Sequence, residues 1–116
     1  MPSNREIRLT IEFKRNLRQL AKKFRHIKSD LQPLLVQLEV GETPGDRVLG
    51  IKYVIYKVRV QNSDIGKGKR AGYRLLYYLK FDNLTILLTI YAKNEQEDIP
   101  LEKIRQIITD FDESEN

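Results

Sequence analysis

The segment from Leu84 to Tyr91 constrains the fold most, because it is a nearly continuous run of apolar residues. A strand that is apolar on both faces belongs in the interior of a sheet. Two further strand-like segments precede it, at Lys52 to Val60 and at Gly72 to Lys80. The residues Phe81-Asp82-Asn83 suit a turn between the last two strands. The sequence therefore predicts three consecutive strands in the second half of the chain.

The first half of the chain predicts one strand and two helices. Glu6 to Phe13 alternates between polar and apolar residues, as a half-buried strand does. From Lys14 to Lys28 the apolar residues recur at helical spacing. Ser29-Asp30-Leu31-Gln32 looks like a capping box for a second helix, with Pro33 in its first turn and Gly41 at its end. Helices joined this closely are expected to form an antiparallel hairpin.

A chain of 116 residues is expected to form one domain, spanning 1–116. Pro100 to Phe111 predicts a last helix with proline at its start. The predicted order is then strand, helix, helix, three strands, helix. This order predicts a small α+β domain in which an antiparallel-rich sheet packs against the helical hairpin and the C-terminal helix. The acidic residues from about 110 to 116 are expected to form a solvated tail.

Positive charge is concentrated in two parts of the chain. The whole sequence has 21 Lys and Arg against 16 Asp and Glu, a net charge of +5. Nine cations and two anions lie between Arg5 and Lys28, and eight cations and one anion between Lys52 and Lys80. Residues from Glu95 to the end include two cations and eight anions. This asymmetry favours a polyanionic partner for the basic parts, although many solvated helices also carry such a charge.

The composition also limits the cellular compartments and the kinds of site chemistry that we expect for this protein. The chain has no cysteine, so disulfides and thiolate metal sites are unavailable to it. No apolar run reaches the length of a membrane helix, and no apolar signal segment follows residues 1–5. We expect a cytoplasmic protein that has no membrane partner and needs no cofactor or metal. Its single histidine, His26, excludes a catalytic histidine pair.

Two of the predicted strands place cations among apolar residues. Because side chains alternate along a strand, Lys57 and Arg59 share one face, and Tyr56 and Val58 share the other. Arg74 has the opposite parity to its neighbours Tyr73, Leu75 and Tyr77. Antiparallel pairing would bury one face of this sheet and gather positive charge on the other, a surface suited to phosphate.

Other residues are candidates for nucleic-acid contact. The loop Gln61 to Ala71 contains two glycines beside three cations, and several basic or aromatic residues flank the cationic strands. The candidates are Lys52, Lys67, Lys69, Arg70, Tyr78 and Tyr91. Each feature has a plainer interpretation. The cations can be the solvated half of an ordinary strand or loop, Arg74 can form a structural salt bridge, and the tyrosines can pair across strands.

Three segments resemble the RelE/ParE superfamily of bacterial toxins, the toxins of type II toxin–antitoxin pairs. They are Tyr56-Lys57-x-Arg59, Gly72-Tyr73-Arg74-Leu75-Leu76-Tyr77 and Leu87 to Lys93. By element order the resemblance runs from about Ile7 to Ile108. In the RelE branch, it implies an endoribonuclease that enters the ribosomal A site. There the 2′-hydroxyl of the mRNA attacks the adjacent phosphate, and the toxin assists the proton transfers and stabilises the anionic phosphate.

The resemblance also implies catalytic positions. Lys57 and Arg59 match the two basic positions of the family's strand, Arg74 matches the arginine that contacts the scissile phosphate, and Lys93 falls near the basic residues after the last strand. The second basic position is often a lysine proposed as general base. Arginine stays protonated, so Arg59 is better suited to binding phosphate than to acting as the base. Lys57 is then the only nearby amine that could lose a proton. The late arginine and tyrosine of RelE are absent, and Tyr91 cannot be equated with that tyrosine.

Two alternatives remain open at the sequence level. One is a ParE-like toxin that binds DNA gyrase without nuclease chemistry, and the other is an inactive relative that only binds its antitoxin. If the protein is a nuclease, its acid and base groups could also be arranged as in HigB-like relatives. The resemblance implies a cognate antitoxin as partner, with the ribosome and mRNA as targets. An acidic, partly disordered antitoxin would suit the basic segments.

Overall fold

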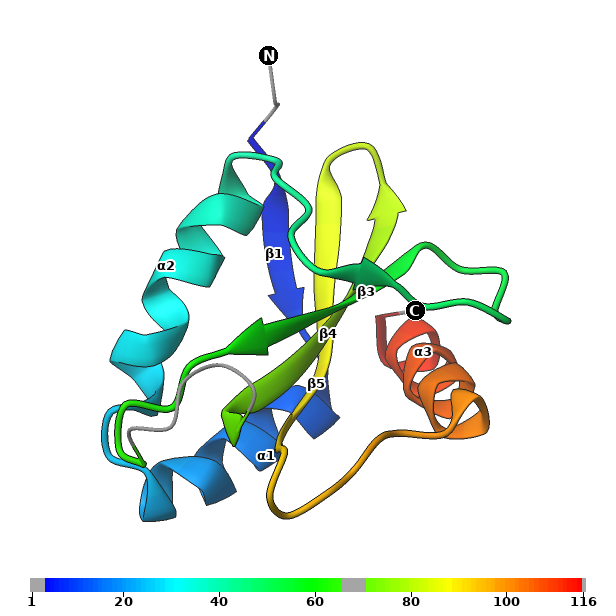
Figure 1. The fold of residues 1–116 in the computed structure, drawn as a ribbon. Coiled ribbons are helices and arrows are strands. Elements are labelled where there is room, and N and C mark those ends of the chain that lie inside the picture. Colours follow the sequence, from blue (N-terminus) through cyan, green and yellow to red (C-terminus); the bar gives the residue numbers. More distant parts are fainter. Residues whose placement is uncertain (1–3, 66–70, 116) are drawn as a thin grey trace.

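Five strands form one mixed sheet in the computed structural model, which describes residues 4–65 and 71–115. The strands are β1 (Glu6–Leu9), β2 (Asp46–Arg47), β3 (Ile55–Val60), β4 (Tyr73–Phe81) and β5 (Leu84–Ala92). Their order across the sheet is β1-β5-β4-β3-β2 (Figure 1). Neighbours from β2 to β5 are antiparallel, whereas β1 lies parallel to β5. The predicted sheet was antiparallel-rich, and this pairing agrees.

Helices cover both faces of the sheet. The helices α1 (Ile11–Lys23) and α2 (Ile27–Glu39) pack on one face, and α3 (Leu101–Glu115) packs on the other (Figure 1). Leu75, Tyr77 and Leu87 are buried under the helical pair. Leu76 and Leu88 are buried under α3. The predicted small α+β domain with three helices is confirmed, and no helix among the described residues could cross a membrane.

The first strand is shorter than predicted. Strand β1 ends at Leu9, and the backbone turns into α1 at Ile11, so the expected strand to Phe13 is wrong. Thr10 causes the change, because its side chain caps the helix by accepting a hydrogen bond from the Phe13 amide at 2.9 Å. Its hydroxyl also donates to the Leu88 carbonyl at 2.7 Å, which ties the cap to β5.

The second helix begins earlier than predicted. It starts at Ile27, so Ser29 lies inside the first turn and is not the cap. Ser29 donates its hydroxyl to the His26 carbonyl, and the Asp30 carboxylate accepts from Ser63. Pro33 therefore lies beyond the first turn, within the helix.

The remaining elements differ from the predictions mainly at their ends. Strand β3 begins at Ile55, three residues after the predicted start at Lys52. The short β2 was not predicted, and it pairs with Tyr56 and Lys57. The predicted tail is wrong for residues 110–115, because α3 continues to Glu115. Two cations from the sheet hold this acidic end: Lys80 pairs with Asp112 at 2.8 Å, and Arg8 pairs with Glu115.

Candidate functional site

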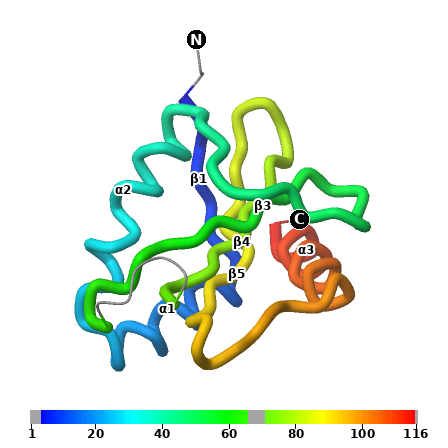
Figure 2. The backbone as a smooth tube through the Cα atoms, in the orientation of Figure 1, coloured from blue at the N-terminus to red at the C-terminus, as the bar shows by residue number. Residues whose placement is uncertain are grey.

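A groove of about 560 Å³ opens on the face of the sheet that carries α3. Its floor comes from β3, β4 and the end of β5, and its walls come from the turn before β2 and from the linker 93–98. Figure 2 shows this linker leaving β5 as a wide arc before it enters α3. The lining residues are Pro44, Gly45, Asp46, Lys57, Val58, Arg59, Arg74, Tyr91, Lys93, Glu97 and Asp98.

Four cations line this groove, and strand register accounts for three of them. Arg59 lies directly opposite Arg74 across β3 and β4, and Arg74 lies opposite Tyr91 across β4 and β5. Lys57 precedes Arg59 by two residues and therefore shares its face. Lys93 follows β5 at the same end of the sheet. The structure therefore confirms that Lys57, Arg59 and Arg74 lie on the same face of the sheet.

The pairing of Arg59 with Arg74 is electrostatically costly. Like charges directly opposite each other on neighbouring strands are destabilising. Arg74 is only 6% exposed, and its Nη1 donates to the Tyr73 carbonyl at 3.2 Å. Burial, and then the positive charge of Arg59, lower the pKa of the Arg74 guanidinium. A bound anion between the two guanidinium groups would offset this repulsion.

Carboxylates of the linker also reach the groove. Lys57 Nζ lies 3.3 Å from Asp98 Oδ1, and Lys93 Nζ lies 3.1 Å from the Glu97 carbonyl. The Ile99 amide donates to Asp98 Oδ1 at 2.8 Å. That hydrogen bond first, and then Lys57 and Lys93, lower the pKa of the Asp98 carboxyl, although burial opposes them. Asp98 is therefore ionised at neutral pH.

Tyr91 brings a buried hydroxyl to the groove. The residue is 5% exposed, and no described residue makes a hydrogen bond of normal geometry with its hydroxyl. The Asp98 carboxylate nevertheless lies close enough to act on it. Burial, and then the charge of Asp98, raise the pKa of Tyr91 to about 12. The side chain therefore stays protonated at neutral pH.

The other predicted contact residues lie elsewhere or outside the described part of the chain. Tyr78 packs edge-to-face on Tyr53 at 5.3 Å, within the apolar cluster under α3. Lys52 lies over the ring of Tyr53, also away from the described lining of the groove. Lys67, Lys69 and Arg70 fall outside the described residues. Sequence reasoning missed Asp98, which the linker brings to Lys57 from 41 residues away.

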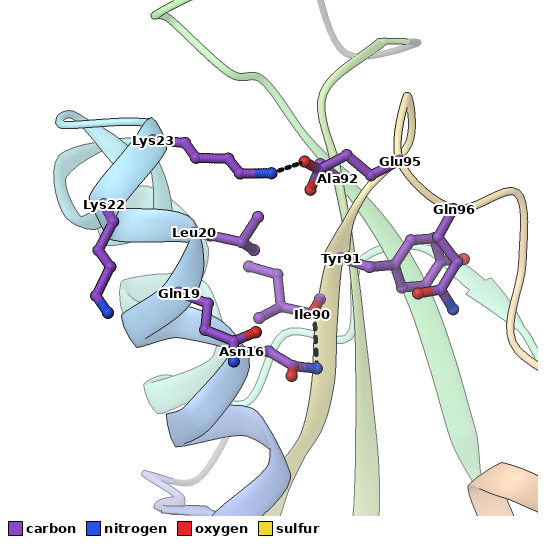
Figure 3. A pocket seen from close by; sticks show the side chains of 10 residues that line it. All are labelled: Asn16, Gln19, Leu20, Lys22, Lys23, Ile90, Tyr91, Ala92, Glu95 and Gln96. Carbon is purple, nitrogen blue, oxygen red and sulfur yellow. Dashed lines mark hydrogen bonds and ion pairs between the residues drawn. The ribbon is translucent and has the colours of Figure 1, made fainter.

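A second pocket, of about 430 Å³, lies between α1 and β5 (Figure 3). Lys23 forms an ion pair with Glu95 across its mouth, and Asn16 donates to the Ile90 carbonyl at 3.3 Å. In Figure 3 Tyr91 points away from α1, toward the other face of the sheet. This pocket lacks the opposed pair of cations that distinguishes the first groove.

No model of a known protein family matches this chain. Within the described residues, no group of three His, Cys, Asp or Glu side chains could hold a metal ion. The functional conclusion therefore rests on the residues of the groove.

Proposed function

We propose that this protein is a RelE-like endoribonuclease, the toxin of a type II toxin–antitoxin pair, which cleaves mRNA on the ribosome. One observation carries the proposal: Arg59 and Arg74 are direct neighbours across two strands and line one groove with Lys57 and Lys93. A fold tolerates such a repulsive pair at a site that binds anions. The resemblance of the strand motifs to RelE/ParE toxins supports the same assignment.

The groove suits transesterification at a phosphodiester. When the 2′-hydroxyl attacks phosphorus, negative charge accumulates on the phosphate oxygens, and fixed cations stabilise that charge. Arginine adds planar, paired donors that match phosphate geometry. Because Arg74 is buried, it is held in place before the substrate arrives, whereas Arg59 is exposed and can close on the phosphate.

The proposed partners are a cognate antitoxin, the ribosome and its mRNA. An antitoxin segment with acidic residues would complement the groove and prevent RNA from entering it. The groove lies on the face carrying α3, so a segment laid beside α3 could contact both.

The test is expression of the protein and its variants in bacteria, with mapping of RNA ends. The wild type should arrest growth and leave mRNA cut at ribosome-positioned sites. We expect Arg59→Ala to lower cleavage by at least tenfold, because one of two opposed phosphate ligands is lost. Arg18→Ala, on the exposed face of α1, is the matched control and should leave cleavage unchanged.

A different outcome would point to the other toxin activity. Growth arrest with filamentation and DNA damage, but without new RNA ends, would contradict the nuclease assignment and favour a gyrase-binding toxin. Full cleavage by Arg59→Ala would show that this groove is not the site.

A further inference from the structure

The groove contains a carboxylate that two hydrogen bonds hold in place. Asp98 Oδ1 accepts hydrogen bonds from Lys57 and from the Ile99 amide. The buried hydroxyl of Tyr91 also lies close enough to the Asp98 carboxylate for the two side chains to interact. The side chain of Asp98 is 67% exposed, so a bound substrate can reach it. The two hydrogen bonds to Oδ1 orient the carboxylate, while most of the side chain stays open to solvent.

The cations in the groove are poor proton acceptors, and of its three lining carboxylates Asp98 is the one that Lys57 of β3 holds in place. Arg59 and Arg74 keep their protons at any physiological pH. The Lys57 ammonium donates to Asp98 and so supplies positive charge. His26 is on the turn before α2, where its Nδ1 lies 2.7 Å from Asp64, and it does not line the groove.

Resting on the proposed function, we propose that Asp98 is the general base of the cleavage reaction. The carboxylate takes the proton of the attacking 2′-hydroxyl while the O2′–P bond forms. The P–O5′ bond then breaks with its electron pair on the 5′-oxygen, which takes a proton from water. The products are a 2′,3′-cyclic phosphate and a 5′-hydroxyl, and Asp98 returns its proton to solvent. Arg59 and Arg74 hold the phosphate during this step.

The surroundings of Asp98 keep it ionised and ready to accept a proton. The charged and titratable groups that line the groove around it are Asp46 from β2, Lys57 and Arg59 from β3, Arg74 from β4, Tyr91 from β5, and Lys93 and Glu97 from the linker. Arg47 of β2 lines the adjoining groove that Asp98 also borders. The nearest groups, Lys57 and Lys93, are cations that favour the carboxylate form.

The experiment measures single-turnover cleavage of a 5′-labelled mRNA on purified, programmed ribosomes. We expect Asp98→Asn to lower the cleavage rate constant by about 10²- to 10⁴-fold, the usual effect of losing a general base, with ribosome affinity unchanged. Glu102→Gln is the matched control, because that side chain is 89% exposed on α3 and is not among the described residues that line the groove, and its rate should equal the wild type.

A second variant separates base catalysis from a structural tether. Asp98→His places a base with a pKa of about 6.5 at the same position. We expect this variant to recover part of the lost rate and to show a new acid limb near pH 6.5. The wild type should show no limb in that range. A tether between Lys57 and the linker would produce no such limb.

The outcomes distinguish the two proposals. An active wild type together with an Asp98→Asn rate within threefold of it overturns the role of Asp98 and leaves the proposed function standing. An Asp98→His cleavage rate that does not change between pH 5.5 and 8 also overturns the role of Asp98 and leaves the proposed function standing. A wild type that yields no cyclic phosphate ends on ribosomes overturns the proposed function itself. Circular dichroism of each variant verifies folding, and if Asp98→Asn fails to fold, the Asp98→His profile decides.

Discussion

At the scale of single residues, the proposed role of Arg59 comes at the expense of the stability of the fold. Its neighbour across the strands is the buried Arg74, and the two guanidinium groups repel each other. We expect Arg59→Gln to raise the free energy of unfolding by about 0.2–1 kcal/mol, because a like-charged cross-strand pair is removed. Urea denaturation at low ionic strength would measure the change.

The same repulsion predicts a dependence on salt. Added salt screens the pair, so the stability difference between wild type and Arg59→Gln should shrink as ionic strength rises. Arg18→Gln serves as a control because an exposed helix site should change stability by less than about 0.5 kcal/mol. A loss of stability in Arg59→Gln would mean that its aliphatic stem contributes more than its charge costs.

Strand alternation was enough to predict that Lys57, Arg59 and Arg74 share a face, because parity is a local property of the sequence. It could not predict Asp98, since the linker that carries this residue has no periodic pattern. Only the path of the backbone from β5 to α3 brings its carboxylate to Lys57. Tyr78 has suitable parity as well, but it is partly buried against the apolar cluster under α3 and packs on Tyr53.

At the scale of elements, the contact between β3 and β4 depends on Gly72. A Cβ on this residue would lie 2.0 Å from the Val60 carbonyl oxygen, which is too close for any side chain. We expect Gly72→Ala to lower the free energy of unfolding by about 1–3 kcal/mol, since the two strands must separate. The shift would also move Arg74 relative to Arg59, so the proposed RNA cleavage should fall as well.

Thermal denaturation and the ribosome cleavage assay would measure these two effects. Gln61→Ala is a suitable control, because the side chain is exposed immediately after β3. If Gly72→Ala were as stable and as active as the wild type, the close approach of the two backbones would not matter to the site.

The errors in element assignment have a common cause. The alternation of Ile7, Leu9, Ile11 and Phe13 fits a strand, yet Phe13 also begins the helical pattern of α1. Tertiary contacts decide between these periods, because Thr10 caps the helix and bonds to β5 at the same time. The acidic end of α3 is a similar case. Its charges suggest a solvated tail, but Lys80 and Arg8 pair with them.

At the scale of the whole molecule, charge is divided between its parts. The basic residues are concentrated in the segment from β1 to the start of α2 and around the groove, whereas the acidic residues are concentrated in α3 and the preceding linker. We expect the affinity for a fluorescein-labelled single-stranded RNA decamer to fall as salt rises. For two to four phosphates bound, the slope of log K against log salt should lie between about −1.4 and −2.8.

Arg59→Gln should make this slope less steep by about 0.7, the contribution of one phosphate contact on a single strand. Fluorescence anisotropy at several salt concentrations would measure both slopes. Affinity that does not change with salt would indicate that apolar surface dominates RNA binding.

The overall architecture followed from the sequence because the strands and helices carry strong hydrophobic patterns. Two features of the sheet could not be predicted from the sequence in this way. The strand β2 has only two residues, too few for a pattern, and its pairing depends on the turn at Gly45. The parallel pairing of β1 with β5 joins segments far apart in the chain, where local periodicity carries no information.

That parallel pairing also sets the order in which the protein can mature as it is synthesised. Glu6 lies opposite Leu84, and Leu9 lies opposite Leu87, so the first strand made has no partner until the last strand has been translated. Contacts of such long sequence separation form late and slow the folding of small domains. The groove also needs late residues, because Tyr91 lies near the end of β5 and Lys93, Glu97 and Asp98 follow it, so the groove cannot be complete before they are translated. If the groove cleaves ribosome-bound mRNA, this delay protects the message that is still being translated into the protein.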